Sequence, residues 1–123
     1  MPKILVAEDE KDIRDLVGFT LNLSGYEVVF AVNGAEAINL ATAERPDLIL
    51  MDMRMPVLTG EEAAKRLLEI EETAAIPIVF LTARDNDPQI SGIISHGMDY
   101  ICKPFSIEQL TTKVKSKLTE VHQ

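Results

Sequence analysis

The sequence lacks the features of a secreted or membrane-bound protein. Its 123 residues contain one cysteine, Cys102, so no disulfide can form within the chain, and intracellular residence is the simplest interpretation. No apolar run approaches the roughly 20 residues that a membrane-spanning helix requires. The chain begins directly with a strand-like segment, so we expect no signal peptide. From these absences we expect a cytoplasmic protein that has no membrane partner.

Basic residues and metal-binding histidines are also scarce. The chain has 12 Lys and Arg against 20 Asp and Glu, for a formal net charge of −8. A nucleic-acid-binding surface needs clustered basic residues that displace counterions, so we expect no direct contact with nucleic acid. A basic protein partner is compatible with this charge. Neither His96 nor His122 follows a strand-like run, and the sequence has no His-Cys cluster, so a zinc site is not expected.

Short apolar runs alternate five times with longer segments of helical periodicity. The runs are Ile4–Ala7, Glu27–Ala31, Leu48–Met51, Ile78–Leu81 and Tyr100–Cys102. This alternation predicts an α/β fold, in which helices cover both faces of a parallel sheet. Right-handed crossovers then limit the sheet to a few doubly wound strand orders. The sequence has no repeat, linker or low-complexity stretch, so we expect one domain over residues 1–123.

Capping residues predict where four of the helices begin. Three pairs have the spacing of a helix cap and its reciprocal side chain, namely Asn33 with Glu36, Thr59 with Glu62, and Ser106 with Gln109. Asp87-Pro88 combines a capping residue with a proline at the first helical position, which predicts a further helix that ends at Gly97.

Polar residues close four of the apolar runs. Glu8 and Asp9 follow the first run, Asp52 the third, Thr82 the fourth and Lys103 the fifth. Because the carboxyl ends of parallel strands meet at one edge of the sheet, we expect these five side chains to converge there. That edge is where open α/β sheets bind ligands.

Each of these residues alone has an ordinary structural explanation, and only the set indicates a site. Acids near a helix start interact with its dipole, a threonine caps local backbone, and a strand-end lysine reaches solvent. Asp52, however, comes from a different strand than Glu8 and Asp9, and three carboxylates held together raise each other's pKa values. Mg²⁺, which binds oxygen ligands, relieves that repulsion. The three negative charges of the carboxylates are then balanced by the two positive charges of Mg²⁺ and the one of Lys103. At such a site Asp52 could act as a nucleophile that forms an acyl phosphate.

In this order and at these spacings, the residues resemble the receiver domain of a two-component response regulator over the whole length of the chain. The motifs are Glu8-Asp9, Asp52 followed by Met55-Pro56 and Gly60, Leu81-Thr82-Ala83, and Asp99-Tyr100 leading to Lys103-Pro104-Phe105. The resemblance implies a flavodoxin-like, doubly wound sheet of five parallel strands in the order 2-1-3-4-5, with five helices. It also implies a signalling phosphoacceptor and not an enzyme, whose only chemistry is self-catalysed phosphotransfer and hydrolysis of its aspartyl phosphate.

The resemblance implies specific roles for the acids. Asp52 would accept the phosphoryl group from a phosphohistidine on a sensor histidine kinase or a phosphotransfer protein. Glu8, Asp9 and Asp52 would hold Mg²⁺, together with the backbone carbonyl of Arg54. Glu8 stands where many relatives have Asp, and its extra methylene leaves both direct and water-mediated metal contact open.

The resemblance also implies how the phosphoryl group is read. Thr82 would donate a hydrogen bond to one phosphoryl oxygen, and Lys103 would form an ion pair with another. Tyr100 would turn inward as Thr82 moves, and the bond between Lys103 and Pro104 would be cis. The fourth helix, fifth strand and fifth helix would form the output surface, which would act on a downstream protein or a covalently linked output domain.

Arg54 and Arg84 occupy positions that flank the phosphoryl group in the family and tune its hydrolysis. They lie two residues after Asp52 and Thr82, respectively. We hypothesise that the two arginines screen the phosphoryl group and slow attack by water. The alternative is that both side chains point into solvent.

Three other functions fit the sequence less well. A flavodoxin-like FMN binder needs a loop of Gly, Ser and Thr after the first strand, whereas Glu8-Asp9-Glu10 repels phosphate. A phosphate-ester hydrolase with an aspartate nucleophile typically has a second acid two residues later, where this chain has Arg54. A receiver-like module that binds partners without phosphorylation would not need all five site positions filled, as they are here.

Overall fold

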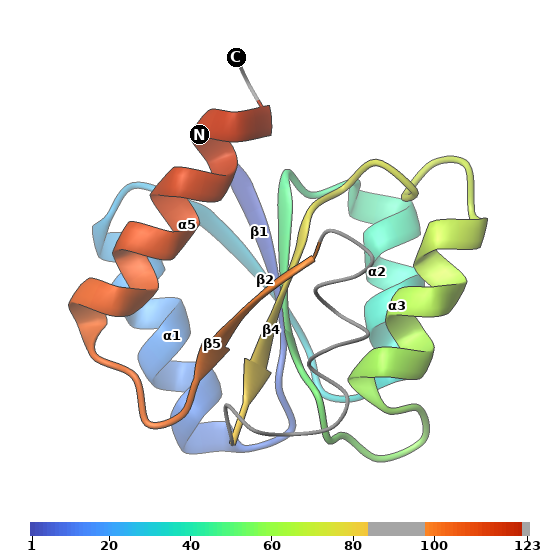
Figure 1. The fold of residues 1–123 in the computed structure, drawn as a ribbon, viewed down its shortest axis with the longest axis horizontal. Helices are drawn as coiled ribbons and strands as arrows, with labels where there is room; N and C mark the ends of the chain where they lie inside the picture. The colour runs from blue at the N-terminus through green and yellow to red at the C-terminus, as the bar shows by residue number, and fades with distance from the viewer. Residues whose placement is uncertain (84–97, 122–123) are drawn as a thin grey trace.

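Five parallel strands form one sheet in the order β2-β1-β3-β4-β5. The structure is a computed structural model that describes residues 1–83 and 98–121. Its strands are β1 (Lys3–Ala7), β2 (Glu27–Ala31), β3 (Leu48–Asp52), β4 (Ile78–Thr82) and β5 (Asp99–Cys102) (Figure 1). The strand order implied by the resemblance is therefore confirmed.

Helices cover both faces of this sheet. Within the described residues they are α1 (Lys11–Leu23), α2 (Gly34–Glu44), α3 (Gly60–Glu69) and α5 (Ile107–Val121). The pair α1 and α5 lies on one face, and the pair α2 and α3 on the other (Figure 1). The structure thus shows four of the five expected helices. The remaining one, predicted between Asp87-Pro88 and Gly97, falls outside the described residues.

The core consists of two apolar layers, one on each face of the sheet. On β3, Ile49 and Met51 belong to the layer under α2 and α3, whereas Leu48 and Leu50 belong to the layer under α1 and α5. Successive side chains alternate in this way because a strand points them to opposite faces. Every residue of β3 and β4 is buried, which explains why both sequences are almost entirely apolar. No helix in the described part of the chain combines the length and apolarity needed to cross a membrane.

Three helices begin at the capping residues that the sequence predicted. In each, the capping side chain accepts a hydrogen bond from the amide three residues later: Asn33 from Glu36 at 2.8 Å, Thr59 from Glu62 at 3.1 Å and Ser106 from Gln109 at 3.0 Å. The helix α1 differs, because Glu10 precedes it without making a side-chain cap. The start of α1 therefore lacks the side-chain cap that these three helices have.

Candidate functional site

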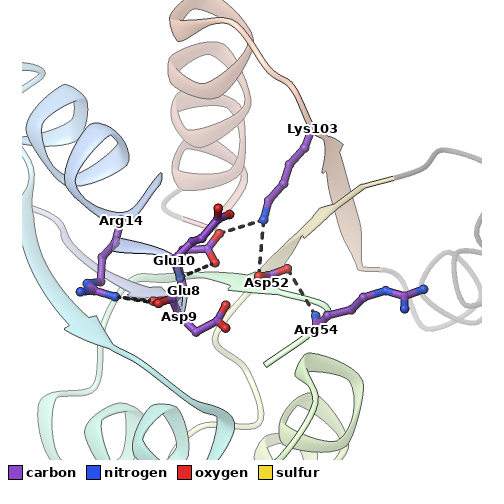
Figure 2. Close-up of polar contacts among 7 residues, drawn as sticks. All are labelled: Glu8, Asp9, Glu10, Arg14, Asp52, Arg54 and Lys103. Carbon is purple, nitrogen blue, oxygen red and sulfur yellow. Dashed lines mark hydrogen bonds and ion pairs between the residues drawn. The ribbon is translucent and has the colours of Figure 1, made fainter. Parts of the chain in front are cut away.

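At the carboxyl ends of β1, β3 and β5, the cation Lys103 lies between the two acids Glu8 and Asp52 (Figure 2). Lys103, which follows β5, places its Nζ 2.9 Å from Oε1 of Glu8 and 3.4 Å from Oδ2 of Asp52. Glu8 directly follows β1, and Asp52 is the last residue of β3. These residues are distant in sequence but meet because parallel strands end at one edge. The structure brings them together as the sequence predicted.

Asp9 joins Glu8 and Asp52 in a cluster of three carboxylates. One oxygen atom from each residue lies within 4.8 Å of those from the other two. Glu8 is fully buried and Asp52 is only 7% exposed, whereas Asp9 is exposed. Carboxylate oxygens are the ligands that Mg²⁺ takes in proteins, usually with part of its shell left to water or phosphate. This set of donors, accessible on the side of Asp9, fits such a cation.

The carboxyl group of Glu8 resists ionisation. Burial raises the pKa of Glu8 above the usual value for glutamate, and the neighbouring Asp52 raises it further. Lys103 and the amide of Glu10, which donates to Oε2 at 3.2 Å, lower this pKa without cancelling the increase. Burial and the neighbouring Asp52 thus both disfavour the charged form of Glu8, and a divalent cation bound to its oxygen atoms would favour that form.

The ammonium group of Lys103 stays charged inside this site. Burial lowers the pKa of Lys103, but the hydrogen bond to Glu8 and the negative charge of Asp52 outweigh burial and raise the pKa above its usual value. The side chain is 19% exposed. A charged donor held beside Asp52 is well placed to bind a further anionic group attached there.

The loop that follows β3 packs closely around Asp52. The amide of Arg54 donates to Oδ1 of Asp52 at 3.3 Å, and the amide of Gly60 donates to the carbonyl of Met53 at 3.0 Å. A Cβ atom at Gly60 would lie 2.1 Å from the carbonyl oxygen of Asp52, so the approach requires glycine. The guanidinium of Arg54 points away from the carboxylates (Figure 2). Arg84, the second predicted tuning residue, falls outside the described residues.

Thr82 and Tyr100 lie on the neighbouring strands β4 and β5. Thr82 is the last residue of β4 and is 1% exposed. Its carbonyl accepts a hydrogen bond from the amide of Lys103 at 2.7 Å, which holds the two residues side by side. Tyr100 lies within β5 and is half-buried. The peptide bond between Lys103 and Pro104 is cis, the conformation that the resemblance implied.

Arg14 and Asp99 make contacts that the sequence pattern did not predict. Nη1 of Arg14 donates to the backbone carbonyl of Glu8 at 3.0 Å. Asp99, one of the motif residues, is not part of the acid cluster; its carboxylate pairs with Lys113 at 2.9 Å and with Lys117 at 3.2 Å. A contact to a backbone carbonyl leaves no residue pattern, and the pairs of Asp99 join elements whose relative position only the fold sets.

Known proteins match this chain over almost its whole length. The model of the response regulator receiver domain family matches residues 4–115. RpaA of Synechocystis, a DNA-binding dual master transcriptional regulator, is 39% identical over 119 residues, which are 96% of this chain and 49% of RpaA. The chain spans about half the length of the transcriptional regulators that it matches.

Solved structures of receiver domains share this fold. Chemotaxis protein CheY4 of Vibrio cholerae superposes with a TM-score of 0.88 at 33% identity, covering 94% of this chain and 98% of CheY4. The receiver domain of sensor histidine kinase PA1611 from Pseudomonas aeruginosa, which has a magnesium ion coordinated in its active site cleft, gives a TM-score of 0.88 at 31% identity, covering 96% and 98%. The chain belongs to the receiver domain family of two-component response regulators, whose members are signalling phosphoacceptors.

Proposed function

We propose that this protein carries a phosphoryl group on Asp52, received from the phosphohistidine of a sensor histidine kinase or of a phosphotransfer protein. The observation that carries this proposal is the place of the Asp52 carboxylate, at the end of β3 and 3.4 Å from the ammonium of Lys103. In the transfer, a carboxylate oxygen of Asp52 attacks the phosphorus atom. The bond between phosphorus and the histidine nitrogen breaks, and its electron pair stays on that nitrogen.

Mg²⁺ is the proposed cofactor, held by Glu8, Asp9, Asp52 and the backbone carbonyl of Arg54. Two features support it: the carboxylate oxygens that lie within 4.8 Å of one another, and the raised pKa of the buried Glu8. The magnesium ion in the active site cleft of the PA1611 receiver domain supports it as well. The cation would supply positive charge that offsets the carboxylates and the incoming phosphoryl oxygens.

Lys103 and Thr82 are the proposed ligands of the phosphoryl oxygens. Lys103 already lies beside Asp52 and stays charged, so its ammonium can pair with an oxygen of the group attached there. A backbone hydrogen bond holds Thr82 beside Lys103, and the hydroxyl of Thr82 would donate to a second phosphoryl oxygen. Such donors stabilise the charge of the transferred group. Arg54 and Arg84 are proposed to slow the later hydrolysis of the phosphoryl group.

The proposed readout runs from Thr82 and Tyr100 to a surface made of the predicted fourth helix, β5 and α5. The hydrogen bond between the Lys103 amide and the Thr82 carbonyl supports this route, because a shift of Thr82 would act on β5, where Tyr100 lies. Phosphorylation adds roughly one further negative charge and three strong acceptors to bias this equilibrium. The output would be a downstream protein or a covalently linked domain, and this acidic domain would not itself contact nucleic acid.

Residues 1–123 are proposed to act as a single receiver domain. The two core layers lie on opposite faces of one sheet, and the family match covers residues 4–115. The cytoplasmic location of the protein, without a membrane partner, stays a prediction from the composition.

Intact-mass measurement after incubation with a small acyl phosphate and Mg²⁺ tests the phosphoacceptor. The wild type should gain the mass of one phosphoryl group, and Asp52→Asn should gain none. Asp15→Asn is the matched control, because Asp15 is an exposed carboxylate that pairs with Lys11 on α1 and should not affect labelling. Labelling of Asp52→Asn at the wild-type level would contradict the assignment. Steady turnover of a phosphate ester would instead favour a hydrolase.

A further inference from the structure

The side chain of Arg14 binds two backbone carbonyl groups of the acid cluster. Nη1 of Arg14 donates to the carbonyl oxygen of Glu8 at 3.0 Å and to that of Asp9 at 3.4 Å. Figure 2 shows Arg14 on the side of Glu8 and Asp9 that faces away from Asp52 and Lys103. The guanidinium thus touches the peptide groups of two of the three acids without entering the space between their carboxylates.

The junction that Arg14 holds lacks the usual support at a helix start. The helix α1 follows Glu10 without a side-chain cap, whereas the capping residues of α2, α3 and α5 bond to the amide three residues later. The amide of Glu8 bonds to the carbonyl of Ala31, and the amide of Glu10 bonds to Oε2 of Glu8. Arg14 adds bonds to the two intervening carbonyls, so the loop is held through both its amides and its carbonyls.

We propose that Arg14 is a positioning residue for the cation site: by binding the carbonyls of Glu8 and Asp9, it keeps their carboxylates turned toward Asp52. This inference rests on the proposed magnesium site. Its physical basis is preorganisation, because groups that orient the ligands of a metal ion lower the cost of ordering those ligands on binding. Asp9 should depend on it most, since its side chain is exposed.

The sign of the effect separates positioning from simple electrostatics. Arg14 carries a positive charge beside the backbone of Glu8 and Asp9, and a positive charge near the site opposes a bound cation. If charge alone mattered, removing the guanidinium would strengthen Mg²⁺ binding. If positioning dominates, removing it weakens Mg²⁺ binding even though the site becomes more negative.

Titration of the full chain with Mg²⁺, followed through the amide resonances of residues 8–10, measures this effect without any phosphotransfer. Arg14→Gln is expected to bind Mg²⁺ about tenfold more weakly than the wild type, the range seen when groups that orient metal ligands are lost. Lys11→Gln is the matched control, because Lys11 lies on the same helix, carries the same charge and pairs only with Asp15 among the contacts seen in the described residues. It should bind Mg²⁺ as tightly as the wild type or slightly more tightly.

The outcomes separate failure of this inference from failure of the proposed function. Equal or tighter Mg²⁺ binding by Arg14→Gln would overturn the positioning role while the magnesium site stands. A wild type that binds no Mg²⁺ would overturn both. If urea denaturation shows that Arg14→Gln is not folded, Arg14→Lys tests the positioning role instead. Its ammonium keeps the charge but cannot match the reach of the guanidinium, so binding should weaken about threefold, and unchanged binding would overturn the role.

Discussion

Glu8 is a buried carboxyl group that faces a cation, Lys103, and an anion, Asp52. Because its pKa in the folded protein is raised, the folded state binds the proton of Glu8 more tightly than the unfolded state does. The stability that this proton contributes is fully present below the ordinary glutamate pKa and is lost as pH rises through the raised pKa. At neutral pH, and without a metal ion, the raised pKa of Glu8 therefore lowers the free energy of unfolding relative to that of a carboxyl group with the ordinary pKa.

Replacing Glu8 by glutamine is predicted to stabilise the metal-free protein at neutral pH by about 1 kcal/mol, an ordinary magnitude for a single substitution. Glutamine keeps the shape of the side chain and removes the buried charge. Urea denaturation of both proteins in a chelating buffer measures the difference. The difference should shrink below the ordinary glutamate pKa, where the wild-type carboxyl group is protonated. A variant less stable than the wild type at neutral pH would show that the ion pair with Lys103 outweighs burial.

Arg84→Ala is predicted to shorten the lifetime of the phosphate on Asp52 by roughly fivefold, which corresponds to about 1 kcal/mol in the barrier. The reason is the proposed screening of the phosphoryl group from water by the guanidinium. Decay of the phosphorylated mass, after the acyl phosphate is removed, gives the lifetime. Arg54→Ala should have a smaller effect, because the Arg54 guanidinium points away from the carboxylates (Figure 2). An unchanged or longer lifetime in Arg84→Ala would refute screening.

At the scale of elements, Asp99 ties β5 to α5 through Lys113 and Lys117. Burial alone raises the pKa of Asp99, but the hydrogen bonds from Lys113, from the amide of Tyr100 and from Lys117 outweigh it and leave the pKa below the ordinary value. A lowered pKa means that the stability contributed by ionised Asp99 is present above the ordinary aspartate pKa. It is lost as pH falls through the lowered pKa.

Asp99→Asn is predicted to lower the free energy of unfolding at neutral pH by about 1 kcal/mol, a modest value because solvent screens these partly exposed ion pairs. The loss should vanish in acid, where Asp99 is protonated in the wild type. Urea denaturation across this pH range measures it. Asp15→Asn, which removes the partner of Lys11 on the surface of α1, should lose less. A loss that does not change with pH would mean that charge is not its cause.

The start of α3 packs closely against the backbone of Asp52. Gly60→Ala is predicted to destabilise the protein by about 2 kcal/mol and to reduce labelling of Asp52, because the new methyl group meets the Asp52 carbonyl and must displace it. Intact-mass labelling and urea denaturation measure the two effects. Gly25→Ala is the control: its φ of 93° strains alanine, but the added Cβ would have no atom within 4 Å beyond its chain neighbours. The variant should therefore lose stability and keep labelling. Full labelling of Gly60→Ala would show that this contact does not affect phosphorylation of Asp52.

At the scale of the whole molecule, the proposed switch requires a local charge change to alter a distant face. A beryllium fluoride mimic of the phosphoryl group, added with Mg²⁺, is predicted to shift amide resonances mainly in residues 83–105. The hydrogen bond between the Lys103 amide and the Thr82 carbonyl provides the route to β5. Asp52→Asn should show no such shifts. Changes confined to the immediate neighbours of Asp52 would refute the switch.

Much of the fold and of the site was predictable from local patterns. Alternating apolar runs and helical segments predict a parallel sheet, and three helices do begin at predicted caps such as Asn33 and Thr59. The meeting of Glu8, Asp52 and Lys103 follows from the same pattern, because residues after parallel strands must share an edge. The strand order came from family resemblance, since periodicity alone leaves several doubly wound orders possible.

The sequence by itself thus determined which side chains gather at the edge of the sheet, because strand periodicity and polarity are local properties. The tertiary structure alone decided how they interact. That Lys103 lies closer to Glu8 than to Asp52, and that burial raises the pKa of Glu8, depend on strand register and on the layers above and below the sheet. That Arg14 binds the carbonyls behind the acids depends on where α1 packs, since backbone acceptors carry no trace in the residue pattern.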